Sequence, residues 1–182
     1  MPEKTTQGNA ICSAAVADFP EKRDKAKQFL VEQMWVGAEK RFKTGMMNPE
    51  SSLTPNALAV LALGKEYQDA LVYSEQKFLK SVKMDGTGKT VNGFSDLQDK
   101  NRVSLEGTAA MAAAYSAVGN DVKAAEYLKA LENAMASSKK FAGTAGLAAV
   151  TNDPSWTGAS EKIYVPSQAW YLFAKWKFNP LE

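Results

Sequence analysis

The stretch VSLEGTAAMAAAYSAVG, residues 103–119, decides how the chain folds, because it predicts a helix without a polar face. Its alanine, leucine, methionine, tyrosine and valine side chains point in every direction around the axis, so neighbouring elements must cover it on all sides. The first turn nevertheless contains Glu106, at the end where the helix dipole is positive. The Glu106 carboxylate therefore faces the elements that cover the N-terminal end of this helix.

Helices of this kind alternate along the chain with helices that have a single apolar stripe. The segments that are apolar on all sides are 57–63, 104–118 and 167–174. The segments with one stripe and with Lys and Glu opposite are 21–35, 66–80 and 121–137. A weaker helix is expected at 8–18. The pattern predicts an all-α fold in a single helical domain over residues 1–182, with apolar helices inside and striped helices outside.

The connections between these helices differ greatly in length. Short ones at 64–66 and 119–121 follow the apolar helices and begin with glycines suited to left-handed caps. Long ones, at about 36–53, 81–103 and 138–165, lead back to the N-terminal ends of the apolar helices, so they gather on one face. Long loops are usually functional. One contains MDGTGKT, whose Asp-Gly pair predicts a small β-hairpin near 82–94.

Composition excludes several kinds of site. The chain has no histidine and a single cysteine, which excludes Ser-His-Asp and Cys-His catalysis, histidine-ligated zinc and multi-thiolate metal sites. Lys and Arg exceed Asp and Glu by only 22 − 20 = 2, which gives no global attraction to nucleic acid or anionic membranes. The first twenty residues resemble neither a signal peptide nor a membrane span. We expect no metal, no cofactor, no nucleic acid and no membrane partner.

Inner apolar helices, outer striped helices and long loops on one face resemble the α/α-toroid, or six-hairpin, architecture of many carbohydrate-active enzymes. The segment SLEGTAAMAAAYSAVG looks like the Glu-Gly helix start of inverting, cellulase-type glycosidases of that class, and LTPNALAVLALG and SQAWYLFAKWKFNPL resemble its inner helices. The resemblance covers most of residues 20–181, and seven helices amount to roughly half a toroid. It implies a cleft at the N-terminal ends of the inner helices, with Glu106 as the general acid.

Glu106 also has a structural interpretation. A carboxylate in a first turn stabilises the helix dipole by ~0.3–1 kcal/mol, with Ser104 as the N-cap. In the functional interpretation it points into the mouth where the long loops converge, and burial raises its pKa towards that of a general acid. Acids are common in first turns, and the sequence leaves both interpretations open.

The best second carboxylate is Asp96 in GFSDLQDKNRV, ten positions before Glu106 on the same long loop. Inverting hydrolysis needs an acid and a base about 6.5–9.5 Å apart, so that a water molecule fits between them. The alternative for Asp96 is an Asx turn or a helix cap, which is the usual role of Asp in loops.

Three aromatic residues and an amide are expected to bind the substrate beside these carboxylates. Phe94, Trp156 and Tyr164 belong to the loop-bearing end, where aromatic rings suit the C–H faces of sugars. Gln168 stands alone among apolar residues of the last helix. The alternatives are that Trp156 anchors its loop and that Gln168 is a satisfied core amide.

Three functions remain open on this basis. The first is a carbohydrate-binding or glycoside-hydrolysing module that uses Glu106 and Asp96. The second is a non-enzymatic helical-repeat scaffold that binds a peptide or protein, and the third is a binder of small apolar ligands. Half a toroid also has two open ends, and the last helix has Trp170, Tyr171, Leu172 and Phe173 in succession. We therefore expect a symmetric homodimer joined near the C-terminal helix.

Overall fold

The computed structural model describes residues 4–137, 142–152 and 162–182, which form seven α-helices and three small antiparallel strand pairs. The helices are α1 (Thr6–Ala15), α2 (Pro20–Phe29), α3 (Leu53–Leu63), α4 (Asp69–Phe78), α5 (Leu105–Ala117), α6 (Asp121–Ala134) and α7 (Val165–Lys175). A π-helical turn, Leu30–Met34, continues α2, and a 3₁₀ turn, Lys65–Tyr67, precedes α4. The helix-rich fold predicted from the sequence is confirmed.

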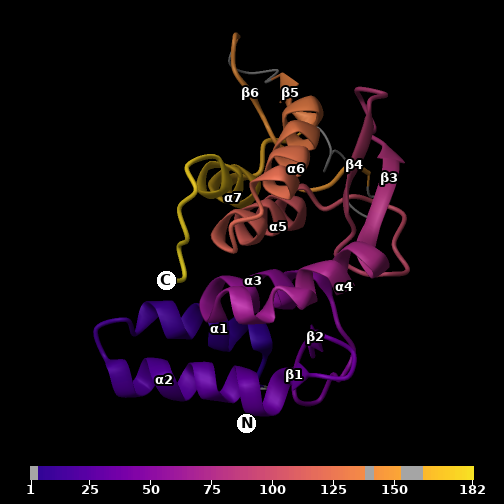
Figure 1. Ribbon diagram of the computed structural model, residues 1–182. Coiled ribbons are helices and arrows are strands. Elements are labelled where there is room, and N and C mark those ends of the chain that lie inside the picture. Colours follow the sequence, from indigo (N-terminus) through magenta and orange to yellow (C-terminus); the bar gives the residue numbers. More distant parts are fainter. Residues whose placement is uncertain (1–3, 138–141, 153–161) are drawn as a thin grey trace.

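The helices form an array of consecutive pairs. Helices α1, α3, α5 and α7 pack against one another in that order, and α2, α4 and α6 each pack against the helix that precedes them (Figure 1). We call α1, α3, α5 and α7 the inner helices. After α7 the chain runs back to α3, where the Asn179 side-chain amide donates a hydrogen bond to the Leu61 carbonyl at 2.9 Å.

The strands exceed the single hairpin that the sequence predicts. That hairpin pairs β3 (Leu79–Lys83) with β4 (Thr90–Phe94), and it begins three residues earlier than the predicted range. Two further pairs join β1 (Trp35–Val36) to β2 (Arg41–Phe42) and β5 (Ala136–Ser137) to β6 (Ala145–Gly146). Strands of two residues are too short to show the alternation of apolar and polar residues by which a strand is predicted.

Helices α3 and α5 are buried around their whole circumference, as their apolar sequences require. The residues of α5 from Gly107 to Tyr115 are all buried. Its far end packs against a stack of aromatic rings in which Tyr127 lies 5.8 Å from Tyr115 and 4.7 Å from Phe94, between ring centroids. The C-terminal end of α5 therefore lies in an apolar, aromatic setting.

Helix α7 departs from the prediction that it is covered on all sides. Ser167 and Ala174 on its inner side are buried, whereas the side chains of Val165, Leu172 and Trp176 are exposed. The physical reason is its place in the described array, where α5 and α6 are the helices that pack closely against it and both lie on its inner side.

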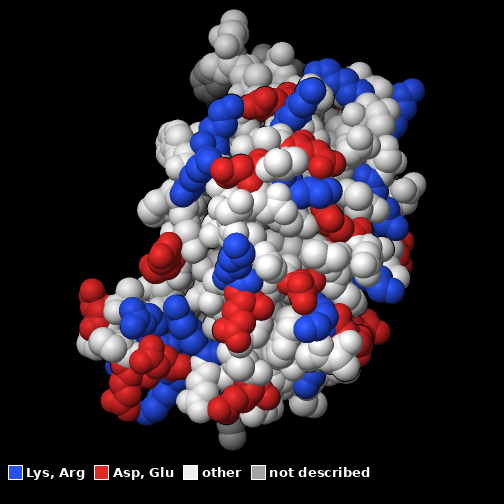
Figure 2. Space-filling model, viewed as in Figure 1, with Lys and Arg blue, Asp and Glu red and all other residues white. Residues whose placement is uncertain are grey.

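The surface has no field of a single sign in the view of Figure 2, where Lys and Arg alternate with Asp and Glu. Several of these charges form ion pairs, such as Lys25 with Glu21 and Lys177 with Asp121. Within the described ranges, every helix is too short or too polar to cross a membrane.

Candidate functional site

A cleft of about 290 Å³ lies at the N-terminal ends of the four inner helices. Its lining residues are Gln7, Thr54, Asp96, Ser104, Glu106, Ala149, Val150 and Tyr164. Gln7, Thr54 and Glu106 are each the second residue of their helices, and Tyr164 is the N-cap of α7. Equivalent positions of the four helices therefore meet in one place, which we call the Glu106 cleft.

The first turn of α5 is held without help from Glu106. The Ser104 hydroxyl accepts a hydrogen bond from the Gly107 N–H at 3.0 Å and so acts as the N-cap. Thr108 donates its hydroxyl to the Ser104 carbonyl at 2.7 Å and accepts the Phe94 N–H at 2.9 Å, which ties α5 to β4. Because Ser104 caps the helix, the carboxylate beside it is not needed for that purpose.

Glu106 is half-buried, and its carboxylate makes no hydrogen bond or ion pair with another residue in the described part of the chain. Burial alone raises the pKa of its carboxyl above the ordinary value of 4.5. A carboxyl that keeps its proton closer to neutral pH, on the wall of a cleft, is suited to act as a general acid. Among the four inner helices only α5 has an acidic residue in its first turn.

Asp96 lines the same cleft but has the opposite electrostatic setting. Both of its carboxylate oxygens accept hydrogen bonds from Arg102, from Nε at 3.0 Å and from Nη2 at 2.7 Å. Burial raises the pKa of Asp96, but the hydrogen bonds and charge of Arg102, together with backbone N–H donors, outweigh burial and lower it. Asp96 is therefore ionised at neutral pH, while Glu106 holds its proton more tightly than a free carboxyl.

One wall of the cleft is a segment far from α5 in the sequence. Val103 and Leu105 pair with residues 149–151, since the Leu105 N–H donates to the Ala149 carbonyl at 2.9 Å and the Thr151 N–H donates to the Val103 carbonyl at 3.0 Å. The Tyr164 N–H donates to the Leu147 carbonyl at 2.8 Å. These backbone bonds fix the start of α7 beside the start of α5.

The cleft continues into a second depression of about 280 Å³, lined by hydroxyl groups. Its lining residues are Thr5, Gln7, Thr44, Ser52, Thr54, Pro55, Asp96 and Leu97, and three of them (Gln7, Thr54 and Asp96) also line the Glu106 cleft. We call it the threonine depression. Its hydroxyls can donate and accept hydrogen bonds, which suits a ligand with many hydroxyl groups of its own.

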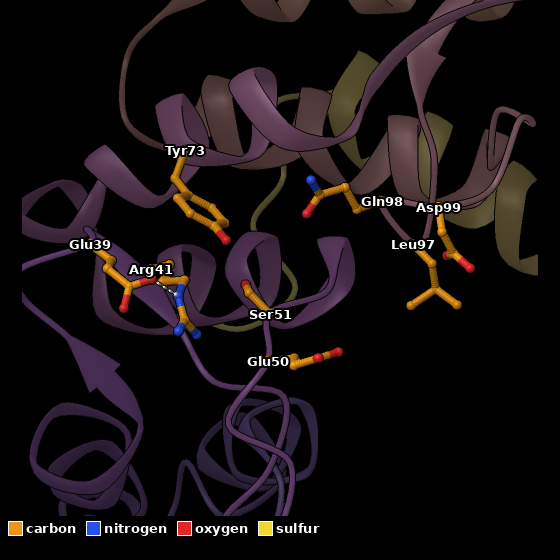
Figure 3. Close-up of a pocket in the computed structure, with 8 residues that line it drawn as sticks. All are labelled: Glu39, Arg41, Glu50, Ser51, Tyr73, Leu97, Gln98 and Asp99. Carbon is orange, nitrogen blue, oxygen red and sulfur yellow. Dashed lines mark hydrogen bonds and ion pairs between the residues drawn. The ribbon is translucent and has the colours of Figure 1, made fainter.

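A third depression, of about 550 Å³, adjoins the second at Leu97. We call it the Arg41 pocket, and its lining residues are Glu39, Arg41, Glu50, Ser51, Tyr73, Leu97, Gln98 and Asp99. In Figure 3 the Tyr73 ring lies above Arg41 and its hydroxyl points into the space that Gln98 faces from the other side. The three depressions adjoin one another through shared lining residues, and we call them together the polar groove, after the hydroxyl, amide and carboxylate groups along it. Tyr73 lies in the depression at one end and Tyr164 in the depression at the other.

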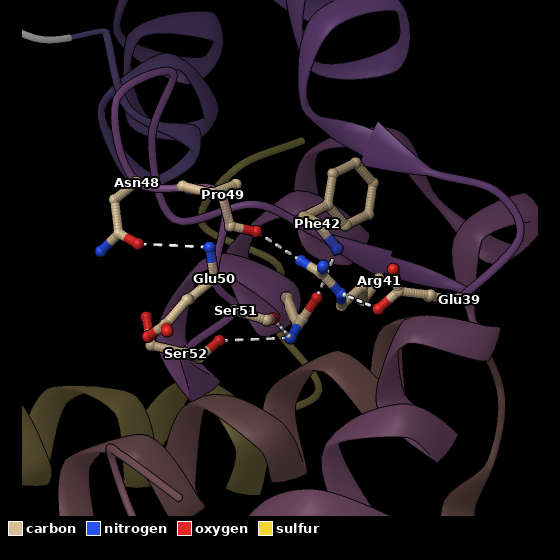
Figure 4. A network of polar contacts seen from close by, with 9 residues as sticks. Glu39, Arg41, Phe42, Asn48, Pro49, Glu50, Ser51 and Ser52 are labelled. Carbon is tan, nitrogen blue, oxygen red and sulfur yellow. Dashed lines mark hydrogen bonds and ion pairs between the residues drawn. The ribbon is translucent and has the colours of Figure 1, made fainter.

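A network of polar contacts, part of it exposed and part centred on the buried Asn56, holds the floor of the Arg41 pocket (Figure 4). Arg41 donates from Nε to Glu39 at 2.7 Å and from Nη1 to the Pro49 carbonyl at 2.7 Å. The fully buried Asn56 of α3 accepts the Phe42 N–H at 2.8 Å and donates to the Ser51 hydroxyl at 2.8 Å. Strand β2 and the loop before α3 are thus fixed to the inner helix.

The structure brings together three of the residues predicted as a site, Glu106, Asp96 and Tyr164. Phe94 does not face the groove, because it is fully buried against Tyr127.

Of the two remaining predicted residues, Gln168 is not among the described residues that line the groove. Gln168 donates its side-chain amide to the Leu147 carbonyl at 3.3 Å, as expected of a satisfied amide. Trp156 lies outside the described residues.

Several residues that line the groove or bind one of its side chains were not predicted from the sequence. Arg102 follows Asp96 by six positions, and this spacing of opposite charges on one loop was the available signal. Gln7, Thr54 and Tyr73 carry no such signal, since only packing shows that the ends of α1 and α3 meet the end of α5 and that α4 lines the Arg41 pocket.

No family model, curated protein or solved structure matches the chain. The described residues contain no cluster of three or more side chains suited to hold a metal ion. The groove itself is therefore the basis for a functional proposal.

Proposed function

We propose that the polar groove binds a neutral oligosaccharide and that Glu106 protonates a glycosidic oxygen in an inverting hydrolysis. The observation that carries the proposal is the pair of carboxyl groups in one cleft, with the pKa of Glu106 raised and that of Asp96 lowered. Opposite shifts of this kind separate an acid from an ionised partner in glycosidases. In this mechanism Asp96 orients the water that attacks the anomeric carbon and accepts its proton.

The chemistry of the groove supports an uncharged sugar chain. Serine and threonine hydroxyls and the Gln7 and Gln98 amides offer hydrogen bonds, and Tyr73 and Tyr164 offer ring faces on which sugars stack. The Arg41 pocket has three carboxylates against one guanidinium, and that guanidinium is already bound to Glu39. Polyanionic chains would meet like charge there, which disfavours uronate or sulfated polymers.

A second candidate function is carbohydrate binding without hydrolysis, and the geometry of Asp96 favours it. Both of its oxygens are engaged by Arg102, and its lowered pKa makes it a weaker base. If Asp96 only orders its loop, the groove has a proton donor in Glu106 but no general base, and it binds a sugar chain without hydrolysing it. The hydroxyl, amide and carboxylate groups along the groove favour a ligand with hydroxyl groups over the third possibility, a small apolar ligand.

We also propose that the array represents part of an α/α-toroid. The succession of inner helices, the outer helix that follows each of the first three, and the cleft at the inner N-terminal ends support it. A fold alone does not specify an activity, so the carboxylates carry the functional proposal.

The experiment is a panel of neutral and anionic oligosaccharides, followed by calorimetry and by NMR of the anomeric configuration of any product. We expect binding of a neutral chain and a product of inverted configuration. Glu106→Gln should abolish hydrolysis and keep affinity within about threefold, since it removes the proton but little volume. Binding without hydrolysis by the wild type would decide for the second candidate.

Glu66→Gln is the matched control, because Glu66 is an exposed acid at the opposite end of α3. It should leave binding and hydrolysis unchanged. If no oligosaccharide binds, or if only polyanionic chains bind, the proposal is wrong and the scaffold interpretation gains support.

A further inference from the structure

The outer side of α7 is apolar along its whole length. Val165, Ala169, Leu172 and Trp176 follow one another at intervals of four, three and four residues, which places them in a single stripe. The buried residues Ser167 and Ala174 lie on the opposite side of the helix. We call these four residues the α7 stripe.

The exposure of the stripe is large for side chains of this type. Val165 is 75% exposed, Trp176 69% and Leu172 37%, and the adjoining Phe178 is 57% exposed with its ring 5.6 Å from that of Phe173. Contiguous apolar surface of this extent on a folded protein is usually an interaction site.

The charges beside the stripe are neutralised within the same chain. Lys175 Nζ lies 2.5 Å from a Glu132 carboxylate oxygen of α6, and Lys177 Nζ lies 2.9 Å from Asp121. Tyr171 also donates its hydroxyl to Glu132 at 3.0 Å. A second copy of the surface could therefore approach without two unpaired lysines facing each other.

We propose that the α7 stripe is the contact surface of a symmetric homodimer, in which the stripes of two copies pack against each other. The exposed parts of its large side chains and of Phe178 amount to roughly 450 Å² of apolar surface, from typical side-chain areas. A specific interface of standard size buries about 800 Å² per partner, and about 65% of a homodimer interface, or about 520 Å² here, is apolar, so the patch supplies most of the apolar area that an interface of this size needs.

The other open edge of the array is a weaker candidate for self-association. The exposed residues of α1 are Gln7, Gly8, Ile11, Cys12 and Ala15, of which only Ile11 is a large apolar residue, and it is 46% exposed. Because an isologous contact uses the same patch twice, the larger patch on α7 is the one that pairs.

The test is sedimentation velocity of the full chain over about 1–100 µM, with binding of glycans playing no part in the readout. We expect the wild type to be a dimer at the upper concentrations. Trp176→Glu should raise the dimer dissociation constant by about 100-fold or more, because the substitution occurs on both sides of the contact. Circular dichroism of this variant should match the wild type, since Trp176 projects outward.

Ile11→Glu is the matched control, with one exposed apolar residue replaced at the opposite edge of the array. It should leave the dissociation constant within about twofold. The proposal is overturned if the wild type remains a monomer of 19.7 kDa at 100 µM. It is also overturned if Ile11→Glu dissociates the dimer and Trp176→Glu does not, which would assign the contact to α1.

Discussion

Helices α5 and α7 have sequences of similar apolar character and very different surroundings. Helix α5 lies between α3 and α7, with α6 and β4 also packed against it, and all its residues from Gly107 to Tyr115 are buried. Helix α7 is packed on one side, and its outer side exposes the α7 stripe. The difference teaches that composition predicts how much apolar surface a helix has, whereas its place in the array decides how much of that surface its own chain covers.

The sharpest way to test this comparison is to place a charge on each helix. Ala113→Asp puts a carboxylate where the side chain is 3% exposed, and we expect it to lower the free energy of unfolding by about 3–5 kcal/mol or to prevent folding. Leu172→Asp on the α7 stripe should cost less than about 1 kcal/mol in the monomer. Urea denaturation at low micromolar concentration measures both, and equal costs would contradict the inner position assigned to α5.

A second prediction compares how tightly each helix is covered. A Cβ atom added at Gly93 of β4 would lie 2.6 Å from the Thr108 hydroxyl and 2.7 Å from Val103 Cγ1, and both of these side chains are stiff and buried. Gly93→Ala should therefore cost about 2 kcal/mol. The corresponding glycine beside α7 has more space for an added Cβ atom.

The matched substitution is Gly146→Ala, whose added Cβ would lie 3.0 Å from Ile163 Cγ2 and 3.1 Å from the Gln168 amide nitrogen. Because Ile163 is exposed and can shift, we expect a cost below about 1 kcal/mol. Thermal unfolding of the two variants gives the order, and a larger cost at Gly146 would mean that the covering of α7 is the tighter of the two.

The sequence predicts the helices of this fold better than their surroundings. Continuous apolar runs identified α3, α5 and α7, apolar stripes identified α2, α4 and α6, and the Asp-Gly turn identified the β3–β4 hairpin, because all three are local signals. The exposure of one side of α7 depends on which helices pack against it, and no local sequence pattern contains that information. The two-residue pairs β1–β2 and β5–β6 are too short to leave a pattern at all.

The candidate site was predictable in the same uneven way. Glu106 and Asp96 were recognisable as carboxylates at the loop-bearing end, and both line one cleft. The sequence predicts that Phe94 binds the substrate, whereas its side chain is buried in the core. Side chains alternate between the two faces of a strand, and the sequence alone does not say which face meets the core. Gln7 and Tyr73 depend on tertiary packing and could not be predicted.

A third prediction concerns the loop that covers the start of α5. Asp96→Asn removes the charge that Arg102 binds through two hydrogen bonds, and we expect a cost of about 1 kcal/mol at pH 7, because the pair is only partly buried. The pKa of Asp96 is lowered in the folded state, so its contribution to stability is present above its ordinary pKa of 3.8 and is lost as the pH falls through the folded-state value.

Denaturation of wild type and Asp96→Asn at a series of pH values measures this contribution. The difference between the two proteins should be constant near neutral pH and should shrink below about pH 3.8. An exposed pair, Lys25 with Glu21 on α2, provides the control, since Glu21→Gln should cost less than about 0.5 kcal/mol. If the stability difference between wild type and Asp96→Asn does not depend on pH, the charge of Asp96 contributes nothing to stability, and only the packing of its side chain does.

The smallest expected effect has the most informative sign, and it concerns Glu106 at the start of α5. Burial raises the pKa of Glu106, so the folded state binds its proton more tightly than the unfolded state, and stability from this group is lost as the pH rises through the folded-state pKa. Glu106→Gln, which is neutral at every pH, should therefore be slightly more stable than wild type at pH 7, by about 0.5 kcal/mol or less, and the gain should vanish below about pH 4.5.

If the Glu106 carboxylate instead stabilises the helix through its dipole, the same substitution should lower the free energy of unfolding by ~0.3–1 kcal/mol at pH 7. Paired denaturation curves at pH 7 and pH 4 separate the two cases, and a loss of stability at pH 7 would return Glu106 to a structural role.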